Sequence, residues 1–395
     1  MRVLLTNNTL IDRAGTELYI RDLAIELMRR GHQPVCYSTR LGAVAEEIRS
    51  ATVPVVRSLE HLGEPPDIIH GHHHYDTLTA MLRFPRTPAI SYCHGWFPRE
   101  EAPLRFPRIL KYVAVSEVCR ERLIVEGGIA PEQIELICNF FDARLFPPRA
   151  PLPVAPRRAL AFGNAFHERD GLPVLREACR RCGIELEAAG KLARGSPEER
   201  PGALLARQDI VFARGRAAIE AMAVGSAVVL AEPGRLGPMV TSPDFGALRR
   251  KNFALRALTR PLEVDAVVEE LRQYDPRDAA AVSQLTRQEC ELQPAVDRIL
   301  ALYECVVAQA RRYPLGPSAE GDWAAARYMG ETGAENRAEL EHWRSRCLAA
   351  ERELADLRGS ATWRLAQGVL RNPLVQLLFG RLIRTVAEGA KSAGK

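Results

Sequence analysis

The chain has 395 residues, of which 47% are hydrophobic and 26% charged, and it carries a formal net charge of +5. Its length favours two domains over one, and its composition excludes a mostly disordered chain. No run of about 18 uncharged apolar residues is present, so no membrane-spanning helix is expected. The N-terminus turns polar too early for a secretory signal, and nine cysteines without framework spacing indicate reduced thiols in the cytoplasm.

Residues 1–146 alternate short apolar segments with amphipathic ones. The first strand is predicted at 2–6 and the first helix at 16–30. Further strands are expected at 35–38, 68–70, 89–93, 113–115 and 134–138. This alternation predicts an α/β domain with a parallel sheet covered by helices on both faces.

A proline-rich segment and a second α/β pattern follow. Five prolines fall within residues 147–156, so 147–157 is predicted to be a stiff interdomain linker. Residues 158–313 repeat the alternation and form the second expected domain, with strands at 159–162, 184–188, 210–212 and 227–230. Two doubly wound, Rossmann-like domains that face each other across a cleft are therefore predicted, with ligands at the carboxyl ends of the strands.

Candidate ligand-binding residues in the first domain follow its strands. Gly15 and Thr16 open the first helix, where free amides favour an anion or a hydroxyl, although a simple capped turn has the same pattern. His70 and His72 end one strand and are expected to line the cleft; their spacing does not suit a metal. His94 ends another strand before a glycine, and either donates to a ligand or is a core histidine.

The most informative stretch of the second domain is residues 215–225. Gly215 starts a helix directly after a strand, so its first amides are expected to face the cleft. Glu220 lies among apolar residues, and a carboxylate there suits the hydroxyls of a ribose; the alternative is a surface glutamate. Cys179 and Cys182 have redox spacing but lie within a helical pattern, which favours simple packing.

These pieces are arranged in a recognisable order. The motifs lie at Gly15-Thr16, Asp67 to His72, His94-Gly95, Val115 to Glu117, Asn139 with Asp142 and Phe146, and Glu220 to Gly225. Over residues 1 to about 300 they resemble the retaining nucleotide-sugar glycosyltransferases of family four, which have the GT-B fold. The resemblance implies that His94 and Glu220 act in catalysis and that Ser116 and Asn139 line the cleft on the acceptor side.

The donor pocket departs from the family pattern. Phe212 stands where the family has a second glutamate, and the family's arginine and lysine after Gly163-Asn164 are missing. A diphosphate needs cationic donors, and the nearest candidates are Lys191, Arg214 and Arg216. We expect the donor to contact them together with the residues Gly15, Thr16, Gly163, Asn164, Gly215 and Glu220.

The C-terminal extension has two parts. Residues 319–358 are predicted to be helical, and an apolar heptad seam at 340–357 favours a homodimer or packing on the body. Residues 359–395 carry six basic residues and one acidic residue, so the rest of the chain is neutral, which argues against nucleic-acid binding. The basic, apolar segment 361–386 suits an anionic membrane surface; docking on the protein's own core is the alternative.

The resulting hypothesis is a bacterial glycosyltransferase, cytoplasmic and peripheral to the inner face of the cell membrane. It would move a sugar from a nucleoside-diphosphate donor, with retention and without metal or cofactor, to a glycan or lipid-linked acceptor in cell-surface or secreted polysaccharide synthesis. The alternative is a catalytically degenerate GT-B protein that serves as a partner-binding subunit, because the donor pocket is atypical.

Overall fold

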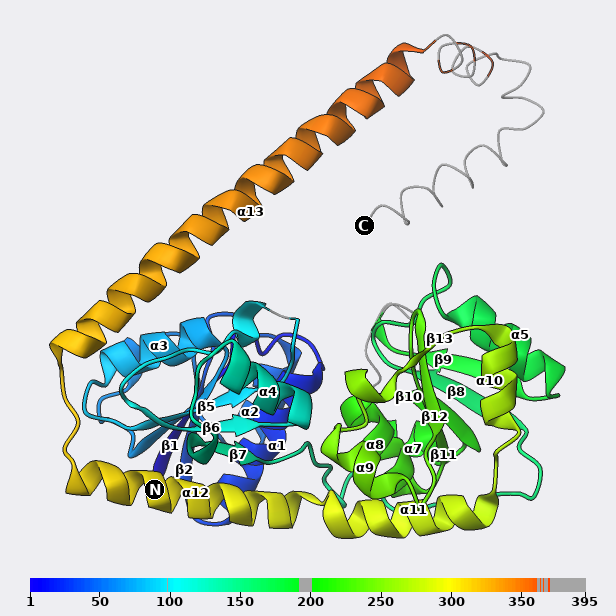
Figure 1. The fold of residues 1–395 in the computed structure, drawn as a ribbon, viewed down its shortest axis with the longest axis horizontal. Coiled ribbons are helices and arrows are strands. Elements are labelled where there is room, and N and C mark those ends of the chain that lie inside the picture. The colour runs from blue at the N-terminus through cyan, green and yellow to red at the C-terminus, as the bar shows by residue number, and fades with distance from the viewer. Residues whose placement is uncertain (98, 192–200, 361–362, 364, 366–368, 370–395) are drawn as a thin grey trace. The chain divides into compact units, whose positions relative to one another are not determined.

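A computed structural model describes residues 1–97, 99–191 and 201–360, together with 363, 365 and 369. The chain divides into a body, Met1–Asp322, and a C-terminal part, Trp323–Lys395. The body contains two α/β lobes, blue to cyan and green in Figure 1. The expected architecture of two helix-covered, mainly parallel sheets is confirmed.

The first lobe is built on a seven-stranded parallel sheet with the order β3-β2-β1-β4-β5-β6-β7. Its strands are β1 Arg2–Thr6, β2 Gln33–Tyr37, β3 Val55–Val56, β4 Ile68–His72, β5 Ala89–Cys93, β6 Ile109–Ala114 and β7 Ile134–Leu136. Its helices are α1 Gly15–Arg29, α2 Ala43–Ser50, α3 His74–Arg83 and α4 Glu117–Val125, with short 3-10 helices η1 Leu59–His61, η2 Arg99–Glu101 and η3 Pro131–Gln133. Because β1 pairs in parallel with both β2 and β4, the chain reverses its winding at β1 and leaves a crevice there.

The second lobe has a six-stranded sheet with the order β13-β12-β11-β10-β8-β9. Its strands are β8 Arg158–Phe162, β9 Glu185–Ala189, β10 Ile210–Ala213, β11 Ala227–Glu232, β12 Arg235–Met239 and β13 Arg260–Pro261. Four of them are parallel, and β12 and β13 add an antiparallel edge. The helices of this part are α5 Leu172–Arg181, α7 Pro201–Leu205, α8 Gly215–Val224, α9 Phe245–Arg250, η4 Leu255–Ala257, α10 Val264–Leu271 and α11 Pro276–Glu289.

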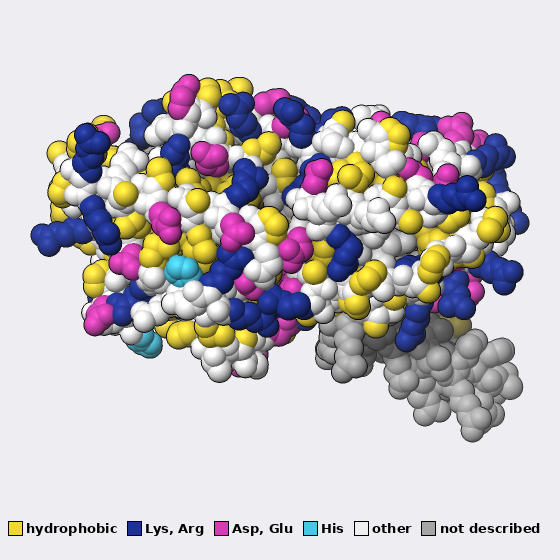
Figure 2. Space-filling view, turned by 90° about the horizontal axis from the view of Figure 1, so that it is seen from below, with side chains coloured by type: hydrophobic (Ala, Val, Ile, Leu, Met, Phe, Trp, Pro, Cys, Tyr) yellow, Lys and Arg dark blue, Asp and Glu magenta, His cyan; other side chains and the backbone are white. Residues whose placement is uncertain are grey.

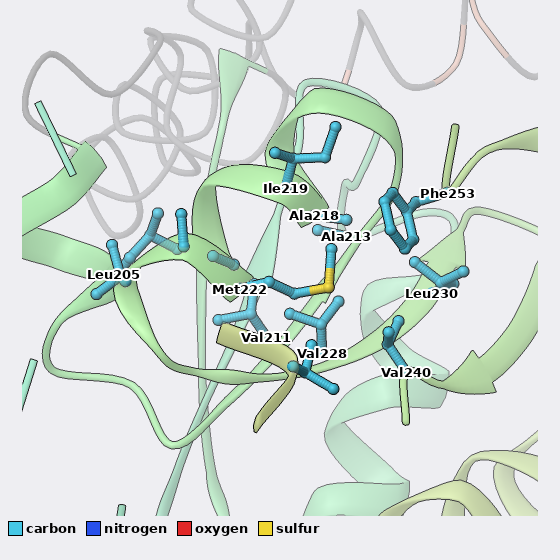
Figure 3. Packing of buried hydrophobic residues seen from close by; sticks show 14 of the residues in the cluster. Leu205, Val211, Ala213, Ala218, Ile219, Met222, Val228, Leu230, Val240 and Phe253 are labelled. Carbon is cyan, nitrogen blue, oxygen red and sulfur yellow. The ribbon is translucent and has the colours of Figure 1, made fainter. Parts of the chain in front are cut away.

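Helix α8 is held by the core of the second lobe. Met222 lies over Val211 of β10 and Val228 of β11, which are neighbours in the sheet, and all three side chains are buried (Figure 3). Full burial of an apolar side chain of this size contributes about 1.5–3 kcal/mol. The packing therefore fixes the position of the helix whose first residues reach the cleft.

The boundary expected at residue 313 is wrong in one respect. Residues 292–312 form α12, Leu292–Arg312, which lies along the first lobe although it follows the second in sequence (Figure 1). Arg298 of α12 donates to the carbonyl of Leu136 in β7, and the hydroxyl of Tyr303 is 2.5 Å from Nδ1 of His70 in β4. The apolar face of α12 thus completes the first core, which local periodicity could not reveal.

The chain crosses between the lobes twice, and the crossings lie together. The amide of Phe141 donates to Cys290, and the amide of Leu292 donates back to Phe141. The proline-rich linker 147–157 then follows the second lobe, where Arg149 pairs with Asp209. The two covalent connections between the lobes therefore lie side by side.

The C-terminal part contains the helix α13, Ala319–Gly359, which begins within the body's last residues, so helix is confirmed over the expected range. Leu340, Trp343 and Leu357 of the expected heptad seam are exposed. No described helix is long and apolar enough to cross a membrane. Most of the expected membrane-binding segment 361–386 lies outside the described residues.

The face of the body in Figure 2 mixes Lys and Arg with Asp and Glu side chains.

We expect Tyr303→Phe to lower the free energy of unfolding by about 1–3 kcal/mol, because Nδ1 of His70 loses its buried partner. Urea denaturation followed by circular dichroism measures this difference. Tyr313→Phe is the control, since Tyr313 is 62% exposed and follows α12. Equal stability of the two variants would show that the buried hydrogen bond does not anchor α12.

Candidate functional site

A cavity of about 600 Å³ lies between the two lobes, at the carboxyl ends of their parallel strands. From the first lobe it is lined by Asn8, Arg13, Ala14, Gly15, Thr16, Leu18, His73, His94, Gly95, Glu100, Glu101 and Asn139. From the second lobe it is lined by Phe162, Gly163, Asn164, Ala165, Phe166, Gly190, Pro201, Arg214, Gly215, Arg216, Ala217, Glu220, Ala231, Glu232, Pro233, Asn252 and Ala254. We call this the donor cavity below, after the ligand expected there.

Two glycines open helices at the donor cavity. Gly15 begins α1 and Gly215 begins α8, and a Cβ at either position would meet nothing within 4 Å. Gly215 also has a φ of +57°, which other residues rarely adopt. Both helix starts thus leave room for a ligand to approach the backbone amides that have no partner within the helix.

Arg216 is buried at the centre of the interface between the lobes. Its Nη2 pairs with Asp22 of α1, and its Nε donates to Glu220 of its own helix at 2.7 Å. Burial opposes the charge of Arg216, but the two carboxylates outweigh burial and raise its pKa. Burial also raises the pKa of Glu220 despite its arginine partner, whereas the neighbouring arginines overcome burial and lower the pKa of Asp22.

The third nitrogen of the Arg216 guanidinium has no partner. Nη1 is buried and makes no hydrogen bond, although Arg216 is only 8% exposed and lines the donor cavity. A buried unpaired donor is costly and is rare in folded proteins. A ligand anion in the cavity would satisfy it.

The other expected donor residues are distributed around the same cavity. Gly163 and Asn164 line it, and the Asn164 amide group donates to the carbonyl of Arg13 across the cleft at 3.3 Å. Arg214 lines it and pairs with Glu232 at 2.6 Å. Lys191 does not line it, and its ammonium pairs with Asp12 at 2.6 Å.

His94 belongs to a polar cluster that sequence reasoning missed. Glu101 of η2 accepts the amide of His94 at 2.7 Å, and its other oxygen lies 3.5 Å from Nε2 of His73. Burial raises the pKa of Glu101 to about 8 and lowers those of His94 and His73 to about 3 and about 4. The two rings are therefore neutral near pH 7, and Nε2 of His94 is buried without a partner.

The expectation that His70 and His72 line the cleft is wrong. Both are fully buried, and their Nε2 atoms lie 2.8 Å apart beneath α12. Tyr92 stacks on His70 with ring centres 4.3 Å apart, and burial lowers the pKa of both histidines well below the usual value. They are core residues because Tyr19, Tyr92 and Tyr303 pack on the side of β4 to which their rings point.

Ser116 and Asn139, expected on the acceptor side, occupy different places. Asn139 lines the donor cavity, and its amide donates to the side chain of Asn252 across the cleft at 3.1 Å. Ser116 caps α4 and lines a second cavity of about 440 Å³. That cavity is lined by His94, Gly95, Trp96, Phe97, Ser116, Val118, Cys119, Arg214, Glu232, Arg235, Lys251, Asn252, Ala254 and Leu255.

Little in the sequence could have found the missed residues. Arg13 and His73 lie next to motifs that the sequence analysis singled out, Gly15-Thr16 and the strand ending at His72, so these motifs could have indicated them. Glu101 and Lys251 lie in no such motif. In the part of the chain that the structure describes, no group of three His, Cys, Asp or Glu side chains is placed to hold a metal ion.

Comparison with known proteins agrees with this geometry. Residues 13–145 match the sequence profile of Glycosyltransferase Family 4. A comparison with curated proteins gave no match. The family resemblance seen in the motifs is thereby confirmed for the first lobe.

Solved structures of similar fold span most of the chain. A glycosyltransferase from Rickettsia africae is 14% identical, with a TM-score of 0.56, over 78% of this chain and 98% of that one. HepE of Anabaena, solved with UDP and glucose, is 17% identical, with a TM-score of 0.55, over 77% of this chain and all of its own. A sucrose-phosphate synthase of Thermosynechococcus elongatus is 13% identical, with a TM-score of 0.51, over 78% of this chain and 99% of that one. The chain has the GT-B fold.

Glu101→Gln tests the environment of the polar cluster. The folded chain keeps the Glu101 proton up to a pKa of about 8, whereas the unfolded chain releases it near the ordinary value of 4.5. The wild-type protein should therefore lose stability relative to the variant as pH rises from about 5 to about 8, by up to about 1.4 kcal/mol per pH unit. Above pH 8 the difference should level off.

Urea denaturation of both proteins at pH 5, 6.5 and 8 measures this difference, in which the titration of the histidines cancels. Glu60→Gln, at an exposed position outside the donor cavity, is the control. A constant difference across the three pH values would contradict the raised pKa.

Proposed function

We propose that this chain, a GT-B protein whose residues 13–145 match glycosyltransferase family 4, transfers a sugar from a nucleoside-diphosphate donor to a glycan or lipid-linked acceptor. The observation that carries the proposal is the buried, unpartnered Nη1 of Arg216, a residue at the start of α8 that lines the donor cavity. A cation beside the start of a helix forms a site for a phosphate.

The donor would bind mainly to the second lobe. Its diphosphate would lie at the start of α8, between Gly15 and Gly215, with Arg216 and Arg214 as the cations. The bond from Arg216 occupies Oε1 of Glu220, and a carboxylate can accept further bonds, so ribose hydroxyls fit there. The UDP and glucose bound in HepE of Anabaena, a protein of the same fold, support a uridine donor as the first choice.

The chemical step would depend on the charge of the leaving group. The acceptor hydroxyl forms a bond to the anomeric carbon while the bond to the diphosphate breaks, and the hydroxyl proton passes to the departing phosphate oxygen. Arg216 and the α8 amides would stabilise the negative charge that develops, without a metal ion. Retention at the anomeric carbon is part of the proposal because of the family match.

His94 would act on the sugar as a neutral group. Its ring lines the donor cavity, and its low pKa of about 3 keeps it uncharged at the pH of the cell. A neutral imidazole has one donor and one acceptor nitrogen, which suits a sugar hydroxyl. The closed contacts across the cleft would exclude water and so limit hydrolysis of the donor.

A second candidate is a partner-binding subunit without activity. Phe212, at the position of the second family glutamate, is fully buried in the core of the second lobe and offers nothing to a sugar. Lys191 is also occupied by Asp12. These two facts favour a scaffold role if no nucleotide sugar binds.

The cellular setting belongs to the proposal as well. Synthesis of a cell-surface or secreted polysaccharide, on the inner face of a bacterial membrane, would agree with the basic tail at 361–386. A homodimer would use the seam at 340–357, where the side chains of Leu340, Trp343 and Leu357 are exposed on α13.

A panel of UDP, GDP and dTDP sugars in a thermal-unfolding assay tests the proposal. A ligand that binds only the folded chain stabilises it by about 2.7 kcal/mol at a hundredfold excess over Kd. We expect such a shift with at least one donor, followed by release of the nucleoside diphosphate when acceptor is present. No shift with any of them would leave the partner-binding scaffold as the better account.

Arg216→Lys tests the donor site without unpairing the buried carboxylates. Lysine keeps the positive charge but loses the Nη1 donor, so UDP affinity should fall by about tenfold or more, which corresponds to a charged hydrogen bond of about 1.5–3 kcal/mol. Isothermal titration calorimetry measures the affinity, and circular dichroism verifies the fold.

Arg149→Lys is the matched control for that experiment. Arg149 also lies in the second lobe, with a side chain that donates to the carbonyl of Gln208, but it does not line the donor cavity. Its variant should bind UDP like the wild type. Equal UDP affinity of the two lysine variants would remove Arg216 from the donor site.

A further inference from the structure

The second cavity, of about 440 Å³, adjoins the donor cavity. The two share the lining residues His94, Gly95, Arg214, Glu232, Asn252 and Ala254. A molecule in the second cavity would therefore lie beside His94, where the proposed function places the transferred sugar. This position suits the acceptor.

Positive side chains outnumber negative ones in the lining of the second cavity. Three cations line it, Arg214, Arg235 and Lys251, against the single carboxylate of Glu232, which already pairs with Arg214. In the described part of the chain, no ion pair or side-chain hydrogen bond engages Arg235 or Lys251. Two positive charges thus remain uncompensated.

These two cations come from separate elements. Arg235 is the first residue of β12, and Lys251 is the C-cap residue of α9. Arg235 is exposed and Lys251 is half-buried, and the two elements bring them to one cavity. This arrangement resembles the way in which two or more separate groups hold one anionic substituent.

The opposite wall is apolar and comes from the first lobe. Trp96 is half-buried, and Phe97 is 69% exposed in the loop after β5. Aromatic side chains provide a large contact area at a small cost in conformational entropy. A cyclic molecule with an apolar face fits between this wall and the cations.

We infer that the second cavity binds the acceptor and selects one that carries an anionic substituent, a phosphate or a carboxylate, held by Arg235 and Lys251 while Trp96 and Phe97 contact its ring. The inference rests on the proposed function for the position of the donor. It adds the chemical class of the acceptor, which neither the family match nor the fold specifies.

Binding of three matched probes to the full chain tests the inference: phenyl β-glucoside, phenyl β-glucoside 6-phosphate and phenyl β-glucuronide. Calorimetry without nucleotide should show that at least one anionic probe binds about tenfold or more tightly than the neutral glucoside. The stronger of the two anionic probes identifies phosphate or carboxylate as the preferred group.

The double variant Arg235→Gln, Lys251→Gln should abolish this preference and leave the affinity for the neutral glucoside unchanged. A control that removes two other exposed charges, Arg57→Gln with Arg207→Gln, should keep the preference, since neither residue lines the cavity. UDP affinity should be the same in all three proteins, because Arg235 and Lys251 lie outside the donor cavity.

Two results separate the inference from the proposed function. If anionic and neutral probes bind alike, or if the preference persists in the Arg235 and Lys251 variant, the inference is wrong even where UDP binds. If UDP does not bind but the anionic preference depends on Arg235 and Lys251, the anionic site stands and the transferase function fails.

Discussion

The position of Arg216 between two carboxylates, one from each lobe, determines the geometry of the cleft. Asp22 and Glu220 fix two of its nitrogens, and the pairing continues into the first lobe through Arg21, which binds both Asp22 and Glu47. A buried ion pair adds little net stability compared with apolar residues, but the loss of one partner is costly. The network therefore fixes a position more than it stabilises the fold, and it leaves Nη1 of Arg216 without a partner.

Much of the fold could be predicted because its causes are local. Alternating apolar strands and amphipathic helices specify parallel sheets, and the glycines at 15 and 215 mark the helix starts that face the cleft. The role expected for His70 and His72 was wrong for a nonlocal reason. Their place on a strand is local, but His70 is also covered by Tyr303 of α12, which lies more than 200 residues later in the sequence.

The candidate site also combines features that have a local cause in the sequence with features that do not. The placement of Glu220, Gly215 and Arg216 in the cavity followed from one helix and the strand before it. The partner of Arg216 in the other lobe could not be predicted, since charge pairing across a cleft leaves no periodic signal. Lys191 is the opposite case. The sequence suggested it as a cation for the donor, but in the structure it pairs with Asp12.

The return of α12 to the first lobe has a consequence for the order in which the chain folds during synthesis. The ribosome releases residues 1–146 first, but their core lacks Tyr303 and the apolar face of α12 until residue 312 has emerged. The second lobe, complete at α11, has all its strands and helices earlier. The first core can therefore be completed only after every strand and helix of the second lobe has been synthesised, which departs from the usual N-terminal-first order.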